Sequence, residues 1–226
     1  MDLISFLSYG AAAIVSAAAL YGVAARRRRP IYEGSNPAAD RIAFKVSAIV
    51  GTLLGLFIAS MESMAPGGLE LLGFARSSLG AMVAFLVALS FYTDHRYRKV
   101  DRVVLRVAIL ASIGFGIPRL IEMNTEAFVV LYIVSILIAL ATMFVPSMGD
   151  SDARAFVLLF AAGIPTLGVL YTYYAFLVGI GLWLAYGLVV AAKKRTTKVS
   201  IPMVPYILTP LAIAIAAASL LAPPLL

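Results

Sequence analysis

Residues 129–145 have the sequence VVLYIVSILIALATMFV, which contains no charged side chain. A continuously apolar run of this length is typical of a helix that crosses a bilayer, whereas a strand of a membrane β-barrel alternates between apolar and polar side chains. This stretch therefore predicts an all-α polytopic membrane protein.

The apolar pattern recurs along the whole chain. Of 226 residues, 62% are hydrophobic and 13% are charged, and the mean hydropathy is +1.00. Because a spanning helix needs about 20 mostly apolar residues, we expect about eight transmembrane helices, at residues 3–25, 43–61, 77–93, 103–121, 126–146, 153–171, 173–192 and 201–222. Residues 1–66 would hold two N-terminal helices with a short basic loop, and residues 67–226 a six-helix core.

The basic residues predict the orientation of these helices. Of the 18 Lys and Arg residues, all but Arg76 and Arg119 fall near one set of helix ends, and such residues concentrate on the cytoplasmic side of a cell membrane. We therefore expect loops 26–42, 94–102, 147–152 and 193–200 in the cytoplasm and both termini outside.

Composition also narrows the classes of function. The chain has no cysteine and a single histidine, so we expect no metal site and no cofactor. Topology, together with attraction to anionic membrane lipid, explains the net charge of +7, and nucleic acid is not expected as a partner.

The acidic residues differ in what they predict. Four glutamates, Glu62 among them, fall in predicted outer loops and are expected on the surface. Asp101 precedes a predicted helix, where an acid stabilises the helix N-terminus. Asp94, Asp150 and Asp152 lie at the predicted cytoplasmic boundary, where one of the last two could serve only as a helix cap.

Two carboxyl groups close together cannot both ionise easily, so near neutral pH they share a proton. One then acts as a base that activates water, and the other acts as an acid toward a peptide carbonyl. The sequence offers Asp94 with Asp150 or Asp152 for this role.

Three segments resemble motifs of the prepilin peptidases and archaeal preflagellin peptidases, which are membrane aspartic proteases of the GxGD type. TDHRYRKV at residues 93–100 resembles T-D-x-R-x-R-x-I-P-N, and GDSDAR at residues 149–154 resembles G-x-G-D-x-K. IPMVPY at residues 201–206 resembles the family's I-P-F-G-P-F. The resemblance implies catalytic aspartates at Asp94 and Asp152 and supporting or substrate-binding residues at Gly149, Asp150, Ser151, Arg154, Pro202 and Pro205.

The resemblance also implies a substrate: a type IV pilin or archaellin precursor with a short basic leader followed by a hydrophobic helix. The I-P-N of the first motif is replaced by VDR at residues 100–102, which indicates a divergent substrate preference. The loop at residues 26–42 lacks the cysteines of bacterial members and is closer to the archaeal branch. Two alternatives remain at this point: an intramembrane protease of the presenilin or signal-peptide-peptidase kind, and a proton-coupled transporter that uses the same aspartates.

Overall fold

A computed structural model describes residues 2–26, 37–64, 70–97, 100–123, 126–145, 148–195 and 201–221 of the chain. Within these residues every regular element is a helix, which confirms the predicted all-α class. The elements are α1 (Leu3–Ala25), α2 (Pro37–Glu62), α3 (Leu71–Tyr97), α4 (Arg102–Met123), α5 (Glu126–Ala141), a short 3-10 turn (Thr142–Phe144), α6 (Asp150–Leu167), α7 (Val169–Lys194) and α8 (Val204–Leu221).

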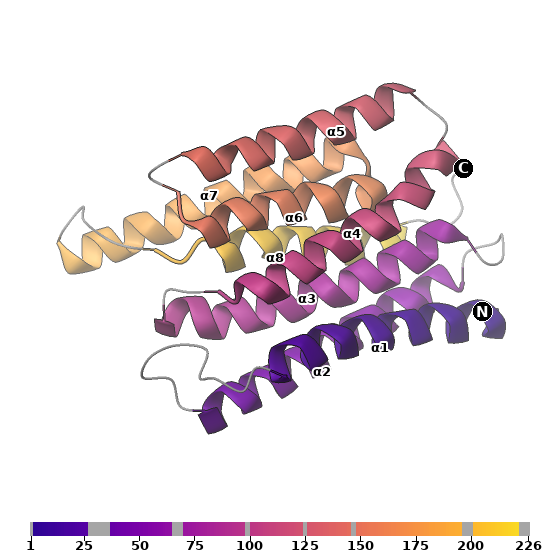
Figure 1. Cartoon of the computed structure of the whole chain (residues 1–226), viewed down its shortest axis with the longest axis horizontal. Coiled ribbons are helices and arrows are strands. Elements are labelled where there is room, and N and C mark those ends of the chain that lie inside the picture. The colour runs from indigo at the N-terminus through magenta and orange to yellow at the C-terminus, as the bar shows by residue number, and fades with distance from the viewer. Residues whose placement is uncertain are drawn as a thin grey trace.

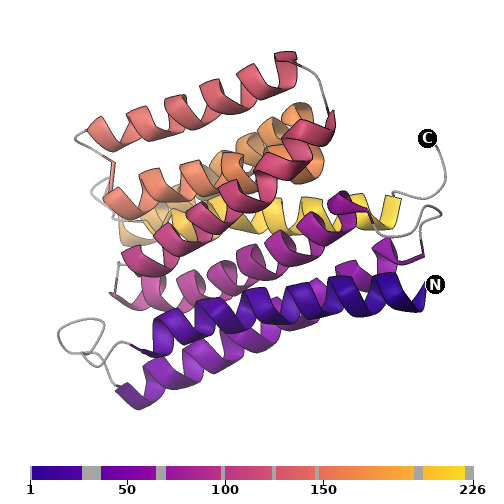
Figure 2. The ribbon, with the colours of Figure 1, turned by 45° about the vertical axis from the view of Figure 1, so that its right-hand side comes forward.

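Judged on the described residues alone, six helices are long and apolar enough to cross a membrane: α1, α2, α3, α5 extended by the 3-10 turn, α7 and α8. The other two, α4 and α6, carry several charged residues within their length and run alongside the six in the same bundle (Figure 1). In both ribbon views α1 and α2 lie at one edge of the bundle and α5 at the opposite edge (Figures 1 and 2).

Helix α6 is the inner helix of this bundle. Every residue from Ala155 to Thr166 is buried, and α6 packs against α3, α4, α5, α7 and α8. A helix that is surrounded by other helices contacts little lipid, so it tolerates polar residues at its ends. The position of α6 thus explains why it is less apolar than the spanning helices.

Small residues allow the first three helices to approach closely. A Cβ atom placed on Gly55 of α2 would lie 2.6 Å from the Cβ of Ala13 in α1 and 2.8 Å from that of Ala81 in α3. Contacts of this kind replace the hydrophobic effect as the source of helix association within a bilayer. The N-terminal pair α1 and α2 is therefore packed directly on α3.

Several helix boundaries differ from the predicted ones. Helix α3 continues to Tyr97 and α6 begins at Asp150, so Asp94 and Asp152 lie within helical turns rather than in the predicted loops. The break between α6 and α7 falls at Gly168, with φ of +83°, and not near residue 172. Only glycine adopts this φ without strain. The predicted break was misplaced because hydropathy is high on both sides of Gly168 and does not mark the end of α6.

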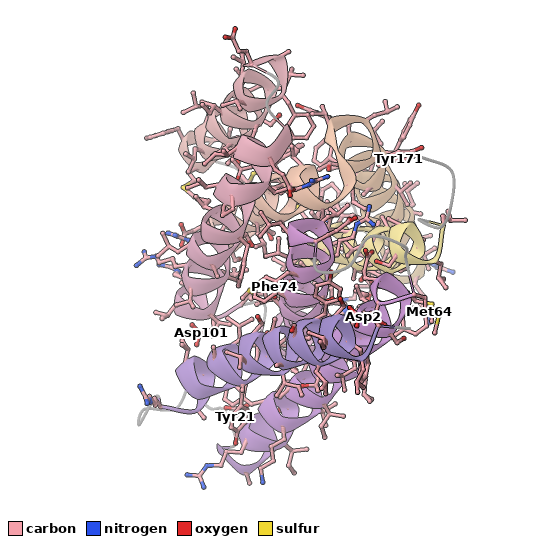
Figure 3. The ribbon with its side chains drawn as sticks, turned by 90° about the vertical axis from the view of Figure 1, so that its right-hand side faces the viewer. Asp2, Tyr21, Met64, Phe74, Asp101 and Tyr171 are labelled. Atoms are coloured by element: carbon pink, nitrogen blue, oxygen red, sulfur yellow. The ribbon has the colours of Figure 1, made fainter. Side chains whose placement is uncertain are left out.

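Helix α1 begins and helix α8 ends at the same end of the bundle (Figures 1 and 2). Seen from that end, Asp2 lies beside Met64 (Figure 3), and the Asp2 N–H donates to the carbonyl of Ser63 at 2.9 Å. Asp2 also caps α1 by accepting from the N–H of Ile4 at 3.2 Å. The start of α1 is thereby tied to the end of α2.

Glu62, which was expected on the surface, is buried at this same end. Its Oε1 lies 2.9 Å from Nη1 of Arg76, and the side chains of Glu62 and Arg76 are 6% and 11% exposed. The Nε of Arg76 also donates to the carbonyl of Thr166 at 3.0 Å. The surface prediction for Glu62 is wrong because an arginine of α3 provides a counter-charge that the linear sequence does not reveal.

Candidate functional site

The two predicted catalytic aspartates lie at the end of the bundle opposite to the start of α1 and the end of α8. Asp94 lies in the last turn of α3 and Asp152 in the first turn of α6, and these two helices pack against each other (Figure 1). Asp94 is 6% exposed, and Asp152 is half-buried. The preceding Thr93 is buried as well, with its hydroxyl donating to the carbonyl of Leu89 at 3.0 Å.

The carboxyl of Asp152 has an unusual affinity for its proton. It precedes the buried apolar stretch of α6 and lies outside the six spanning segments. Burial raises its pKa from 3.8 to about 6, and the negative charge of Asp94 is the second cause. A hydrogen bond from the Gly149 N–H opposes part of this increase. Two carboxyls that are 58 positions apart in the sequence, 152 − 94, are thus close enough in space to interact electrostatically.

Gly149 leaves room for the Asp152 carboxylate. It is the N-cap of α6, and a Cβ atom at this position would lie 2.9 Å from Oδ2 of Asp152 and 4.0 Å from Oγ of Ser151. The Gly149 carbonyl meanwhile accepts the first hydrogen bonds of the helix, from the N–H groups of Asp152 at 3.0 Å and Ala153 at 3.1 Å. The absence of a side chain at position 149 therefore lets the Asp152 carboxylate fold back over the turn.

Asp150 has the opposite environment from Asp152. Its Oδ1 accepts a hydrogen bond from Nη2 of Arg154 at 2.7 Å, and its Oδ2 lies 3.1 Å from Nε of Arg102 on α4. The hydrogen bond from Arg154 lowers the pKa of Asp150, with further contributions from the positive charges of Arg154, Arg102 and Arg106. Asp150 therefore stays ionised and ion-paired within the chain, whereas Asp152 is the carboxyl suited to hold a proton.

Asp101 caps α4. Its Oδ1 accepts from the N–H groups of Val103 and Val104 at 2.8 and 3.2 Å. This agrees with its predicted role at a helix N-terminus. The partner of Arg102 is Asp150, and nothing in the linear spacing of these two residues indicated that pairing.

The third motif meets the end of α3 through aromatic rings. Pro202 and Pro205 are buried before and within the first turn of α8. The ring centroid of the following Tyr206 lies 6.1 Å from that of His95, next to Asp94. The motif at residues 201–206 is thus placed beside the turn that carries Asp94.

Sequence analysis missed the aromatic cluster that forms at this contact, which consists of Phe91, His95, Tyr186 and Tyr206. The rings of Phe91 and His95 stack at 5.8 Å, and Tyr186 from α7 stacks on Tyr206 at 4.9 Å. Aromatic pairs at such distances stabilise a fold by more than the burial of their apolar area alone. The only signal in the sequence was the single histidine directly after Asp94.

Within the described residues, no group of three or more His, Asp or Glu side chains could hold a metal ion. No protein-family model, no curated protein and no solved structure matches this chain.

Proposed function

We propose that this protein is a membrane aspartic endopeptidase in which Asp94 and Asp152 form the catalytic pair. The observation that carries this proposal is the electrostatic interaction of the two carboxyls, which contributes to the raised pKa of Asp152. A carboxyl that keeps its proton into the range near pH 6, beside a second carboxyl, is the arrangement that acid–base hydrolysis of a peptide bond needs.

In this mechanism Asp152 carries the shared proton and Asp94 is ionised before the reaction. Asp94 takes a proton from water as the water oxygen bonds to the peptide carbonyl carbon, and Asp152 gives its proton to the carbonyl oxygen. The resulting tetrahedral diol collapses when Asp152 removes a hydroxyl proton and Asp94 protonates the leaving nitrogen. Both carboxyls then regain their starting states, and one peptide bond has been hydrolysed.

The proposed substrate is a pilin or archaellin precursor, and two features support it. The motif resemblance at residues 93–100, 149–154 and 201–206 implies a leader peptidase. The pair also lies at the end of the bundle rather than at mid-depth, where the junction between a polar leader and a hydrophobic helix would reach it. With the predicted orientation, this end faces the cytoplasm of the cell membrane.

A cleavage experiment with identification of the product tests this function. The full chain is co-expressed with a precursor that carries a short basic leader, and the N-terminus of the product is sequenced. The proposal expects a single new N-terminus at the junction between leader and hydrophobic helix. A cut inside the hydrophobic helix would instead support an enzyme of the presenilin kind. No cut in any precursor would contradict the proposal and leave proton-coupled transport as the next hypothesis.

A further inference from the structure

Three arginines gather around a single aspartate at the end of the bundle that carries the catalytic pair. This arginine cluster consists of Arg102 and Arg106 on α4 and Arg154 on α6. Arg154 and Arg102 contact Asp150 at 2.7 and 3.1 Å, and Arg106 is near enough for its charge to affect the ionisation of the same carboxyl. The group therefore holds three positive charges against one negative charge.

Two of these charges remain accessible. The side chain of Arg102 is 67% exposed, and its Nε faces Asp150. Arg106 is exposed, and it makes no hydrogen bond or ion pair within the part of the chain that the structure describes. Because Asp150 neutralises one arginine, the cluster keeps an excess of two positive charges near the surface of the bundle.

An exposed apolar strip continues from this cluster along α4. Leu110, Ile117 and Ile121 are 69%, 49% and 72% exposed, although α4 is packed on α6 by its other side. At 100° per residue, positions 102, 106, 110, 114, 117 and 121 share one face of a helix. A Cβ atom on Gly114, midway along this face, would meet nothing within 4 Å. The face is thus basic at its first turn and apolar over the rest of its length.

We propose that this face of α4 binds an anionic phospholipid, with the headgroup phosphate on Arg102 and Arg106 and an acyl chain along Leu110, Gly114 and Ile117. Arg102 and Arg106 lie in the first two turns of α4, at an end of the bundle. Guanidinium forks suit phosphate oxygens. Basic residues between helices at a membrane surface are a recognised type of anionic-lipid site. The apolar strip favours a lipid over a free phosphate ion, which would use only the arginines.

The test measures lipid binding to the full chain in detergent by native mass spectrometry. The protein is titrated with phosphatidylglycerol, with phosphatidylcholine of identical acyl chains, and with inorganic phosphate. We expect phosphatidylglycerol to bind about tenfold more tightly than phosphatidylcholine or better, since each basic residue near an anionic headgroup contributes about one kcal/mol. Arg106→Gln should weaken phosphatidylglycerol binding about fivefold and leave phosphatidylcholine unchanged.

Lys194→Gln is the matched control, because Lys194 is an exposed cation at the same end of the bundle, on α7 and outside the cluster. Its binding of phosphatidylglycerol should equal that of the wild type. Equal losses in the Arg106 and Lys194 variants would overturn the site in favour of diffuse surface charge. Equal affinities for the two lipids, or inorganic phosphate binding as tightly as phosphatidylglycerol, would overturn it as well. Unchanged thermal unfolding of Arg106→Gln shows that a loss of binding is not a loss of fold.

Discussion

The charge of Asp94, in the last turn of α3, raises the pKa of Asp152, in the first turn of α6, beyond the increase that burial causes. The two residues belong to helices that are separated by α4 and α5 in the sequence. Their interaction leads to predictions for stability, for the pH dependence of activity and for the neighbouring residues.

Asp152→Asn should make the protein more stable at neutral pH. The folded chain binds the Asp152 proton more tightly than the unfolded chain, so wild-type stability falls as pH rises from about 3.8 to about 6 and then stays level. Asparagine cannot ionise, so the variant avoids the loss of stability that ionisation of Asp152 causes. At pH values above 6 its Tm should therefore exceed that of the wild type by roughly 5 °C. Thermal unfolding in detergent at pH 4 to 8 measures it, and the gain should shrink toward pH 4.

Asp150→Asn is the control for that experiment, because its expected effect on stability at neutral pH is opposite to that of Asp152→Asn. Its pKa is lowered by Arg154, so the ion pair stabilises the fold above the ordinary carboxyl pKa and is lost as pH falls through the lowered value. This variant should be slightly less stable than the wild type at pH 7. If both aspartate variants shift the Tm in the same direction, the assigned environments are wrong.

Peptidase activity should decline above the pKa of Asp152. The mechanism requires Asp152 to be protonated, and its pKa is about 6. Well above that pH, kcat/KM should fall about tenfold per pH unit, as expected when a single ionisation removes the general acid. A pH–rate profile of leader cleavage from pH 4 to 9 measures this decline. A profile that is flat from pH 6 to 9 would contradict Asp152 as the acid.

Gly149→Ala should damage activity more than stability. The new Cβ atom would lie 2.9 Å from Oδ2 of Asp152, and the easiest relief is rotation of that carboxylate away from its present position. We expect cleavage to drop tenfold or more, because small misplacements of a catalytic group are costly. Gly181→Ala on α7 is the matched control, since its Cβ would meet nothing within 4 Å. Equal activity of the two variants would exclude this role for Gly149.

Arg76→Met should destabilise the fold strongly without involving Asp94 or Asp152. It would leave Glu62 buried without its counter-charge, and loss of one partner of a buried ion pair costs about 3–5 kcal/mol. The double variant Arg76→Met/Glu62→Leu should recover most of that loss. Glu122→Gln, which breaks the more exposed pair of Glu122 with Arg119, should change stability by less than about 1 kcal/mol. Thermal unfolding of the wild type, the two single variants and the double variant measures these effects. Equal losses of stability in Arg76→Met and Glu122→Gln would mean that Glu62 is a surface residue after all.

The sequence was informative wherever a local pattern determines the structure. Apolar runs located the helices, and Asp101 was recognised as a helix-terminal acid because a cap depends only on the next few residues. Hydropathy placed helix ends less well, since polar residues such as Asp94 can continue a helix beyond its apolar part. Contacts between helices, such as Arg102 with Asp150 and Arg76 with Glu62, could not be predicted from the sequence because they depend on how the helices pack.

The most direct test of the proposed catalytic pair compares four proteins in the precursor-cleavage assay: the wild type and the variants Asp94→Asn, Asp152→Asn and Asp150→Asn. Our account predicts that the first two variants lose cleavage by at least about a thousandfold, because each removes one partner of the acid–base pair. Asp150→Asn should retain most of the activity, since Asp150 is ion-paired to Arg154 and Arg102. If Asp94→Asn or Asp152→Asn is folded and cleaves the precursor at the wild-type rate, the account is contradicted.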